Sequence, residues 1–205
     1  MAGFLSGWLG LSDPPEFSLA TPRLLMRLPQ MDDHGSWLAL RRASRAFLEP
    51  WEPTWRESDF TPAAFRQRVR RCRALARADE AYRYFIFHRP DNVLVGGVSL
   101  FNVRRGDADA ASLGYWIGQP FARQGFMTEA VGAILDHGFG TLRLHRIEAA
   151  CLPHNEASLR LLARCGFERE GYARAYLKIA GRWQDHVLFA HLAGSSSSFP
   201  RPARN

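Results

Sequence analysis

The feature that most constrains the fold is a strand that breaks at a short turn and passes into a helix with a basic, glycine-containing start. The strand-like run covers residues 113–118, and the turn surrounds Pro120. The helix then opens on Arg123-Gln124-Gly125-Phe126-Met127-Thr128. The first N–H groups of a helix lack partners within the helix and lie at the positive end of its dipole. Since glycine lets a bulky anion approach that backbone closely, the turn predicts a phosphate-binding site.

A second signal is the segment Asn155-Glu156-Ala157-Ser158, which follows a strand-like run at 145–152 and opens a helix at 156–164. Asn155 and Ser158 lie one helical turn apart, so both side chains can face the same ligand. The same pair also fits a simple helix cap. The sequence leaves both roles open.

Hydrophobic periodicity and turn residues predict the remaining elements. The expected strands are 23–28, 82–87, 93–103, 110–117, 145–152, 167–178 and 183–191. The expected helices are 32–45, 61–78, the segment after the glycine turn, and 156–164. A hairpin meander followed by a strand–helix–strand crossover predicts an α/β (α+β) fold, with a mixed sheet and helices on both of its faces.

We expect a single domain over residues 17–193. Residues 1–16 form an N-terminal extension, in which an apolar face between Phe4 and Leu9 is expected to dock on the body or on a second subunit. Residues 194–205, rich in serine and proline, are expected to be a disordered tail. No run approaches a membrane span, and the cysteines do not indicate an oxidising compartment, so we expect a cytoplasmic protein.

The net charge of +7 rests almost entirely on arginine, because only one of the 27 basic residues is a lysine. Such a bias is typical of a compositional habit, although a positive field also attracts polyanions. Several arginines line one side of the expected helix 61–78. That arrangement predicts a solvated face, and a nucleic-acid contact is the alternative. The three cysteines and seven histidines lack metal-ligand spacing, so no metal is expected. Cys72 and Cys151 are expected to be buried thiols.

A loop at 47–61 combines prolines with Trp51 and Trp55. Tryptophan favours half-buried surfaces that have one polar edge. The loop therefore fits either a cover over the core or a wall of a substrate cleft, and the sequence does not choose between them.

These patterns resemble the GCN5-related N-acetyltransferase (GNAT) superfamily. The glycine turn corresponds to the acyl-CoA pyrophosphate loop of that superfamily, with Ala122 in its first position and Met127 in its last. Residues 155–167 resemble its second characteristic segment. The loop at 47–53, the opening Thr21-Pro22-Arg23-Leu24 and the segment 181–186 resemble the bacterial ribosomal-protein N-terminal acetyltransferases, in particular the branch that acetylates the N-terminal alanine of ribosomal protein S5. The resemblance covers residues 17–192.

The resemblance implies a mostly antiparallel sheet of six to seven strands with a splayed central pair, and acetyl-CoA as co-substrate. Backbone groups of Trp116, Ile117 and Gly118 would pair with the pantetheine arm, and one of their N–H groups would stabilise the developing oxyanion. The N–H groups of residues 123–128, namely Arg123, Gln124, Gly125, Phe126, Met127 and Thr128, would hold the pyrophosphate. Asn155 would bond the cofactor arm.

Many superfamily members protonate the departing sulfur with a tyrosine, but Leu162 stands at that position here. The resemblance therefore implies Ser158 as the proton donor. An α-amino group has a pKa of about 7.7–8.0, so it is partly neutral at pH 7 and needs only a weak base. Glu52 is the first candidate for this base, beside Trp51 and Trp55 as acceptor-binding residues, and Glu148 is the second. Both carboxylates also fit purely structural roles.

Three functions remain open at this stage. The first is acetylation of the N-terminal amino group of a ribosomal protein, S5 in particular. The second is acetylation of a small amine, such as a metabolite or an aminoglycoside. The third, of a different class, is a ribosome- or RNA-associated binding protein in which acetylation is secondary. Either a monomer or a homodimer is compatible with the sequence.

Overall fold

The computed structural model describes residues 17–195 of the 205-residue chain. The expected N-terminal extension at 1–16, with its apolar face, lies outside the described residues. So does the expected disordered tail from residue 196 onward.

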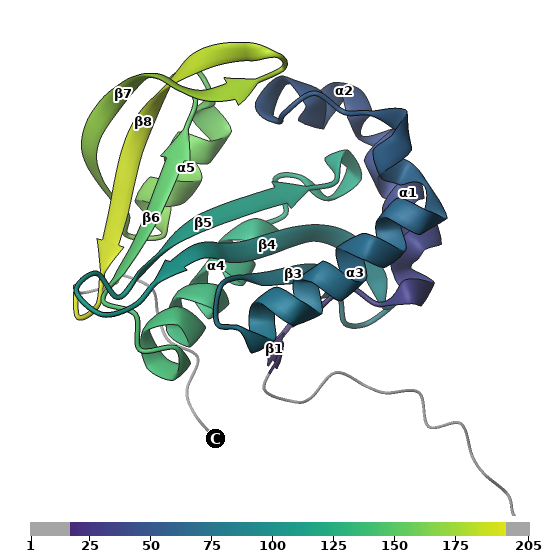
Figure 1. Cartoon of the computed structure of the whole chain (residues 1–205), viewed down its shortest axis with the longest axis horizontal. Coiled ribbons are helices and arrows are strands. Elements are labelled where there is room, and N and C mark those ends of the chain that lie inside the picture. The colour runs from purple at the N-terminus through teal and green to yellow at the C-terminus, as the bar shows by residue number, and fades with distance from the viewer. Residues whose placement is uncertain (1–16, 196–205) are drawn as a thin grey trace, which may run out of the picture.

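Eight strands form one sheet in the order β1-β2-β3-β4-β5-β6-β8-β7 (Figure 1). They are β1 (Ser18–Ala20), β2 (Leu24–Arg27), β3 (Tyr82–His88), β4 (Val93–Arg104), β5 (Ala110–Ile117), β6 (Arg146–Cys151), β7 (Glu168–Ile179) and β8 (Arg182–Leu192). Every neighbouring pair is antiparallel except β5 and β6, which are parallel. The mixed, mostly antiparallel sheet is therefore confirmed. The additional strand is β1, whose three residues are too few to show a period.

Helices cover both faces of the sheet, as expected. One face carries α1 (His34–Ala43), α2 (Arg45–Leu48) and α3 (Pro62–Arg77), and the other carries α4 (Phe126–Asp136) and α5 (Glu156–Arg164) (Figure 1). Alternate residues of β3 point to opposite faces. Phe85 and Phe87 pack with Phe65 of α3, while Tyr84 and Ile86 belong to the core under α4.

The centre of the sheet opens between β5 and β6. The two strands are in register only between Ala110–Ser112 and Arg146–Glu148. Beyond that point β5 follows β4 to Ile117, and β6 follows β8 to Cys151. Figure 1 shows the two strands diverging from their paired end. This divergence is the expected splayed central pair, and we call the space between the two strand ends the gap.

The loop between α2 and α3 contains two short 3-10 helices, Glu49–Trp51 and Glu57–Phe60. Phe60 stacks on Trp37 of α1, and Trp55 contacts Phe60. The same Trp55 also lines a cavity. The loop is thus both a cover over the core and a wall of a cavity, and its role as a wall of a substrate cleft stays a prediction.

A buried hydroxyl joins α1 to the turn that follows β5. Ser44 is fully buried, and its Oγ accepts a hydrogen bond of 2.9 Å from the Gln119 N–H. Gly118 allows this close approach, because a Cβ there would lie 2.4 Å from Leu40 Cδ1. The contact fixes the end of β5 that borders the open end of the gap.

Replacing Ser44 with alanine should lower the free energy of unfolding by about 1 kcal/mol, because the substitution removes the hydrogen bond that the Gln119 N–H donates to Ser44 Oγ. Urea denaturation followed by circular dichroism measures the change. Ser36→Ala is the matched control, since the Ser36 hydroxyl bonds only to a backbone oxygen near the start of α1. A Ser44→Ala variant as stable as Ser36→Ala would contradict the proposed tie.

Candidate active site

The glycine turn adopts the geometry that its sequence requires. Gly125 is the N-cap of α4 with φ +80°, and Arg123 has φ +62°. Both values lie in the left-handed region, which glycine adopts without strain. The first-turn N–H groups of α4 have no acceptor within the helix. The backbone stretch 123–128 is therefore arranged as an anion-binding helix start at the end of β5.

The turn between β1 and β2 supports this helix start. The Arg23 guanidinium donates to Gln124 O at 3.1 Å and to Glu129 Oε2 at 2.6 Å. The Thr21 hydroxyl also donates to Glu129. Burial acts to raise the pKa of Glu129, but the hydrogen bonds from Thr21 and Arg23 outweigh it and hold the pKa below its usual value. Glu129 is thus a structural carboxylate, as its place near a helix start predicts.

Of the three residues at the end of β5 expected to face the gap, Trp116 and Gly118 direct their backbone groups toward β4 instead. The Gly118 N–H donates to Val95 O at 2.8 Å, so it points toward β4. Backbone groups alternate in direction along a strand. Trp116 therefore also pairs with β4, whereas Ile117 and Tyr115 direct their backbone groups into the gap. The direction depends on the register with β4, which the sequence of β5 alone does not contain.

Ser158 lies at the open end of the gap. It is buried, with 7% of its surface exposed, and its Oγ is hydrogen-bonded to the Tyr115 hydroxyl. Burial raises the pKa of Tyr115 far above its usual value. The pair therefore links α5 to β5 through two hydroxyl groups that stay protonated at neutral pH. Sequence analysis identified Ser158 but offered no signal that singled out Tyr115 from the other tyrosines.

Asn155 has the capping role. Its Oδ1 accepts the Ser158 N–H at 3.1 Å, which makes it the N-cap of α5. Asn155 thereby fixes the helix start that carries Ser158. Leu162, where many superfamily members have a tyrosine, is fully buried in the core.

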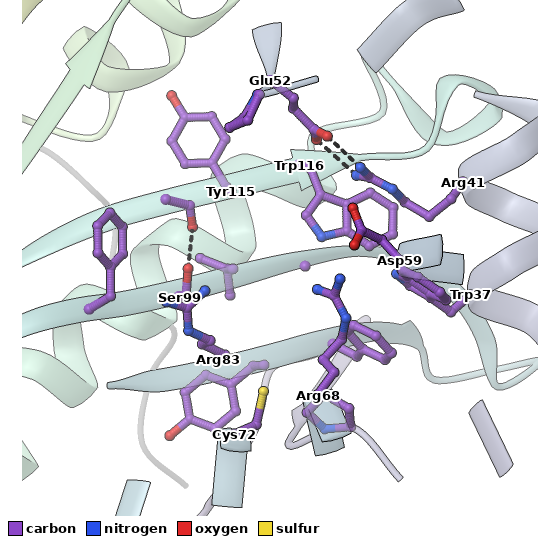
Figure 2. Close-up of a pocket in the computed structure, with 18 of the residues that line it drawn as sticks. Trp37, Arg41, Glu52, Asp59, Arg68, Cys72, Arg83, Ser99, Tyr115 and Trp116 are labelled. Carbon is purple, nitrogen blue, oxygen red and sulfur yellow. Dashed lines mark hydrogen bonds and ion pairs between the residues drawn. The ribbon is translucent and has the colours of Figure 1, made fainter. Parts of the chain in front are cut away.

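A cavity of about 580 Å³ lies on the α1–α3 face of the sheet (Figure 2). Its lining includes Glu52 and Trp55 of the loop, and Tyr115 and Trp116 of β5. Tyr115 is also hydrogen-bonded to Ser158, so it borders both the cavity and the gap. Of the three residues predicted to bind an acceptor, Glu52 and Trp55 thus line this cavity. The third, Trp51, instead packs against His154, with ring centroids 5.5 Å apart.

Glu52 is bound tightly by its neighbours (Figure 2). Arg41 Nη1 donates to Oε1 at 2.8 Å, and Nη2 donates to Oε2. Trp55 Nε1 also donates to Oε2, at 2.8 Å. The guanidinium of Arg41 lies 4.1 Å from the Trp55 ring and 4.9 Å from the Trp116 ring. A carboxylate held in this way braces the loop against α1 and β5.

Glu148, the second candidate base, lies where β5 and β6 cease to pair. It accepts hydrogen bonds from Arg104 Nη2 at 2.6 Å and from Arg146 Nε at 2.9 Å. Both candidate carboxylates are therefore engaged by arginines.

The three cysteines, Cys72, Cys151 and Cys165, are free and buried, which confirms the expectation for Cys72 and Cys151. Burial raises the pKa of Cys151 to about 11, so it stays a thiol at neutral pH. Within residues 17–195, no group of histidine, cysteine and acidic side chains could hold a metal ion. In the same part of the chain, no helix has both the length and the apolar composition needed to cross a bilayer.

Comparisons with known proteins agree with this geometry. Residues 23–168 match the family model described as acetyltransferase (GNAT) domain. The chain is 40% identical over 181 residues to the [ribosomal protein uS5]-alanine N-acetyltransferase of Escherichia coli, covering 87% of this chain and 92% of the relative. It is 36% identical to a probable N-acetyltransferase of Bacillus subtilis, covering 82% and 93% of the two chains.

Two solved structures share the fold. The ribosomal-protein-S5-alanine acetyltransferase of Vibrio fischeri superposes with a TM-score of 0.80 at 32% identity, covering 86% of this chain and 97% of that one. RimJ of Mycobacterium smegmatis in complex with CoA-disulfide has a TM-score of 0.79 at 33% identity, and the match covers 86% of each chain.

Proposed function

The chain belongs to the acetyltransferase (GNAT) domain family, and on this premise we propose that it transfers the acetyl group of acetyl-CoA to the N-terminal amino group of a protein, ribosomal protein S5 with an N-terminal alanine. The observation that carries this proposal is the cavity on the α1–α3 face, whose lining includes Tyr115, the residue hydrogen-bonded to Ser158. The similarity to relatives named for uS5-alanine acetylation supports the choice of acceptor. The proposed catalytic domain spans residues 17–193.

The proposed placement of acetyl-CoA follows the geometry. The helix start at Gly125 holds the pyrophosphate, and the backbone groups of Ile117 and Tyr115 bond the pantetheine arm within the gap. The thioester then lies near Ser158, and the acceptor amine reaches it from the cavity. Acetyl-CoA and the acceptor thus approach the reaction centre from different faces of the sheet, so the two substrates do not compete for space.

The proposed chemistry is direct transfer. The neutral amine attacks the thioester carbonyl carbon, and a gap-facing N–H stabilises the oxyanion that develops. As the carbon–sulfur bond breaks, the sulfur takes the proton of the Ser158 hydroxyl. The Tyr115 hydroxyl, hydrogen-bonded to Ser158 Oγ, then returns a proton to that oxygen. The proton that the amine loses goes to water, and water restores the proton of Tyr115.

The pH dependence should be that of the acceptor rather than of an enzyme carboxylate, because Glu52 and Glu148 are both engaged by arginines. For a peptide with an α-amino pKa of about 7.7–8.0, kcat/KM should rise about tenfold per pH unit below that pKa and level off above it. Initial rates at saturating acetyl-CoA measure the profile. A plateau that begins below about pH 7 would require a base within the enzyme.

Mass spectrometry tests the acceptor directly. A synthetic peptide with the N-terminal sequence of ribosomal protein S5 is incubated with the enzyme and acetyl-CoA, and it should gain one acetyl group on its α-amino group. The same peptide already acetylated at its N-terminus is the control and should gain nothing. No gain on the free peptide, together with acetylation of an aminoglycoside or another small amine, would overturn the proposed acceptor. A cavity of about 580 Å³ is in the size range of small-ligand sites. The comparison with a small amine is therefore an informative part of the experiment.

A further inference from the structure

The cavity contains two arginines that make no ion pair with a carboxylate within residues 17–195. Arg68 extends from α3 and Arg83 from β3 into the cavity, while Glu52 lies on its opposite wall (Figure 2). Among the described residues neither guanidinium makes an ion pair, and each contacts an aromatic ring instead. The Arg68 guanidinium carbon is 4.9 Å from the Trp37 ring centroid. Both residues are exposed to solvent.

The charges of the lining are unbalanced. Arg41, the third arginine, is already paired with Glu52, so Asp59 is the other carboxylate that faces Arg68 and Arg83. Three cationic side chains thus line the cavity against two anionic ones. A cavity with such a surplus favours an anionic group on its ligand.

The electrostatic environment of Arg68 also favours an anionic group on the ligand. Burial lowers the pKa of Arg68, and the charges of Arg41 and Arg83 lower it further. Cys72 and Asp59 offset only part of this effect. A carboxylate placed between Arg68 and Arg83 would relieve the repulsion and form charge-assisted hydrogen bonds with planar guanidinium groups.

We propose that Arg68 and Arg83 form a subsite for an acidic side chain of the acceptor peptide, a proposal that rests on the proposed function. The distance from the reacting amine fixes where this side chain occurs. The strand β3 is separated from β5 by β4, so it lies about 10 Å from β5 at a strand spacing of 4.7–4.9 Å. An extended peptide spans about 3.3–3.6 Å per residue. The third or fourth residue of the acceptor therefore reaches the arginines.

Synthetic peptide amides test the subsite. Each peptide begins with alanine, is otherwise built of serine and glycine, and carries glutamate or glutamine at its third, fourth or seventh residue. At the third or fourth residue, glutamate should raise kcat/KM about tenfold over glutamine, as expected for a charge-assisted hydrogen bond of about 1.5 kcal/mol. At the seventh residue, which lies beyond the cavity, the two peptides should react alike. The amidated ends ensure that a side chain supplies the carboxylate.

Two variants and one control test whether Arg68 and Arg83 cause the preference for the glutamate peptide. Arg68→Gln and Arg83→Gln should each reduce the glutamate preference to about twofold or less, while kcat/KM for the glutamine peptide stays within about twofold of wild type. Arg66→Gln is the matched control, because Arg66 belongs to the same helix but does not line the cavity. It should keep the full preference. Thermal unfolding of each variant confirms that it is folded.

The outcomes separate this proposal from the one on which it rests. Equal kcat/KM for the glutamate and glutamine peptides in the wild-type enzyme would overturn the acidic subsite and leave N-terminal acetylation intact. A preference that survives in both Arg68→Gln and Arg83→Gln would overturn the assignment to these arginines. Acetylation of none of the peptides, while a small amine is acetylated, would overturn the proposed acceptor itself.

Discussion

Ser158→Ala is expected to lower kcat about 100-fold and to leave the Kd for acetyl-CoA within about twofold of wild type, since it removes a proton donor that acts only as the carbon–sulfur bond breaks. The buried Ser158 hydroxyl lies at the open end of the gap and is hydrogen-bonded to Tyr115. Tyr115→Phe should reduce kcat less, by about tenfold, because the serine proton remains. The double variant should be no slower than Ser158→Ala. Steady-state kinetics and calorimetric titration with acetyl-CoA measure the two quantities.

The pH profile adds a second readout for this pair. Since burial raises the pKa of Tyr115, the tyrosine stays protonated above the normal tyrosine range. Wild-type kcat should therefore not decline between about pH 8 and 10, where an unperturbed tyrosine begins to ionise. Ser99→Ala is the control: Ser99 lines the cavity and donates to Gly114 O, away from the gap. An unchanged kcat in Ser158→Ala, or an equal loss in Ser99→Ala, would remove Ser158 from the chemistry.

The local elements of the site were predictable from the sequence, because their signals are local. The strand expected at 110–117 is found at Ala110–Ile117, and the helix expected at 156–164 is found at Glu156–Arg164. Alternating apolar residues define the strand, and an asparagine cap defines the start of the helix. The left-handed turn at Gly125 likewise follows from its residue type.

The partners of the site residues were not predictable, because they depend on tertiary contacts. Glu52 is bound by Arg41, which comes from α1 on the other side of an irregular loop. The N–H of Gly118 is used by Val95 of β4, and this depends on a strand register that no local pattern encodes. Tyr115 belongs to the candidate site because its hydroxyl is hydrogen-bonded to Ser158 of α5, a tertiary contact. Sequence reasoning therefore named candidate residues, Ser158 among them, but not the side chains that hold those residues in place.

Breaking the Arg41–Glu52 pair is expected to lower kcat/KM for the acceptor peptide about 30-fold, uniformly across pH. The two side chains are 11% and 21% exposed. Removing one partner of a fully buried pair costs about 3–5 kcal/mol. Partial solvation reduces this to about 2 kcal/mol, and the loosened loop has to recover this cost before it binds the acceptor, which corresponds to about 30-fold in kcat/KM. The loss arises because the pair holds Trp55 against the cavity, and the backbone oxygen of Glu52 also accepts the Ala180 N–H at 2.9 Å.

A double-mutant cycle decides between a brace and a base. If Glu52 braces the loop, Glu52→Gln and Arg41→Gln should show similar losses, and the double variant should be no worse than either single variant. If Glu52 were the general base, Glu52→Gln would lose most activity at low pH, where few acceptor amines are neutral, while Arg41→Gln would stay closer to wild type. Glu57→Gln is the control, because Glu57 pairs with Arg45 at the exposed end of the same loop. The two hydrogen bonds that Arg41 donates to the oxygens of Glu52 favour the brace, because they fix the carboxylate between α1 and the loop.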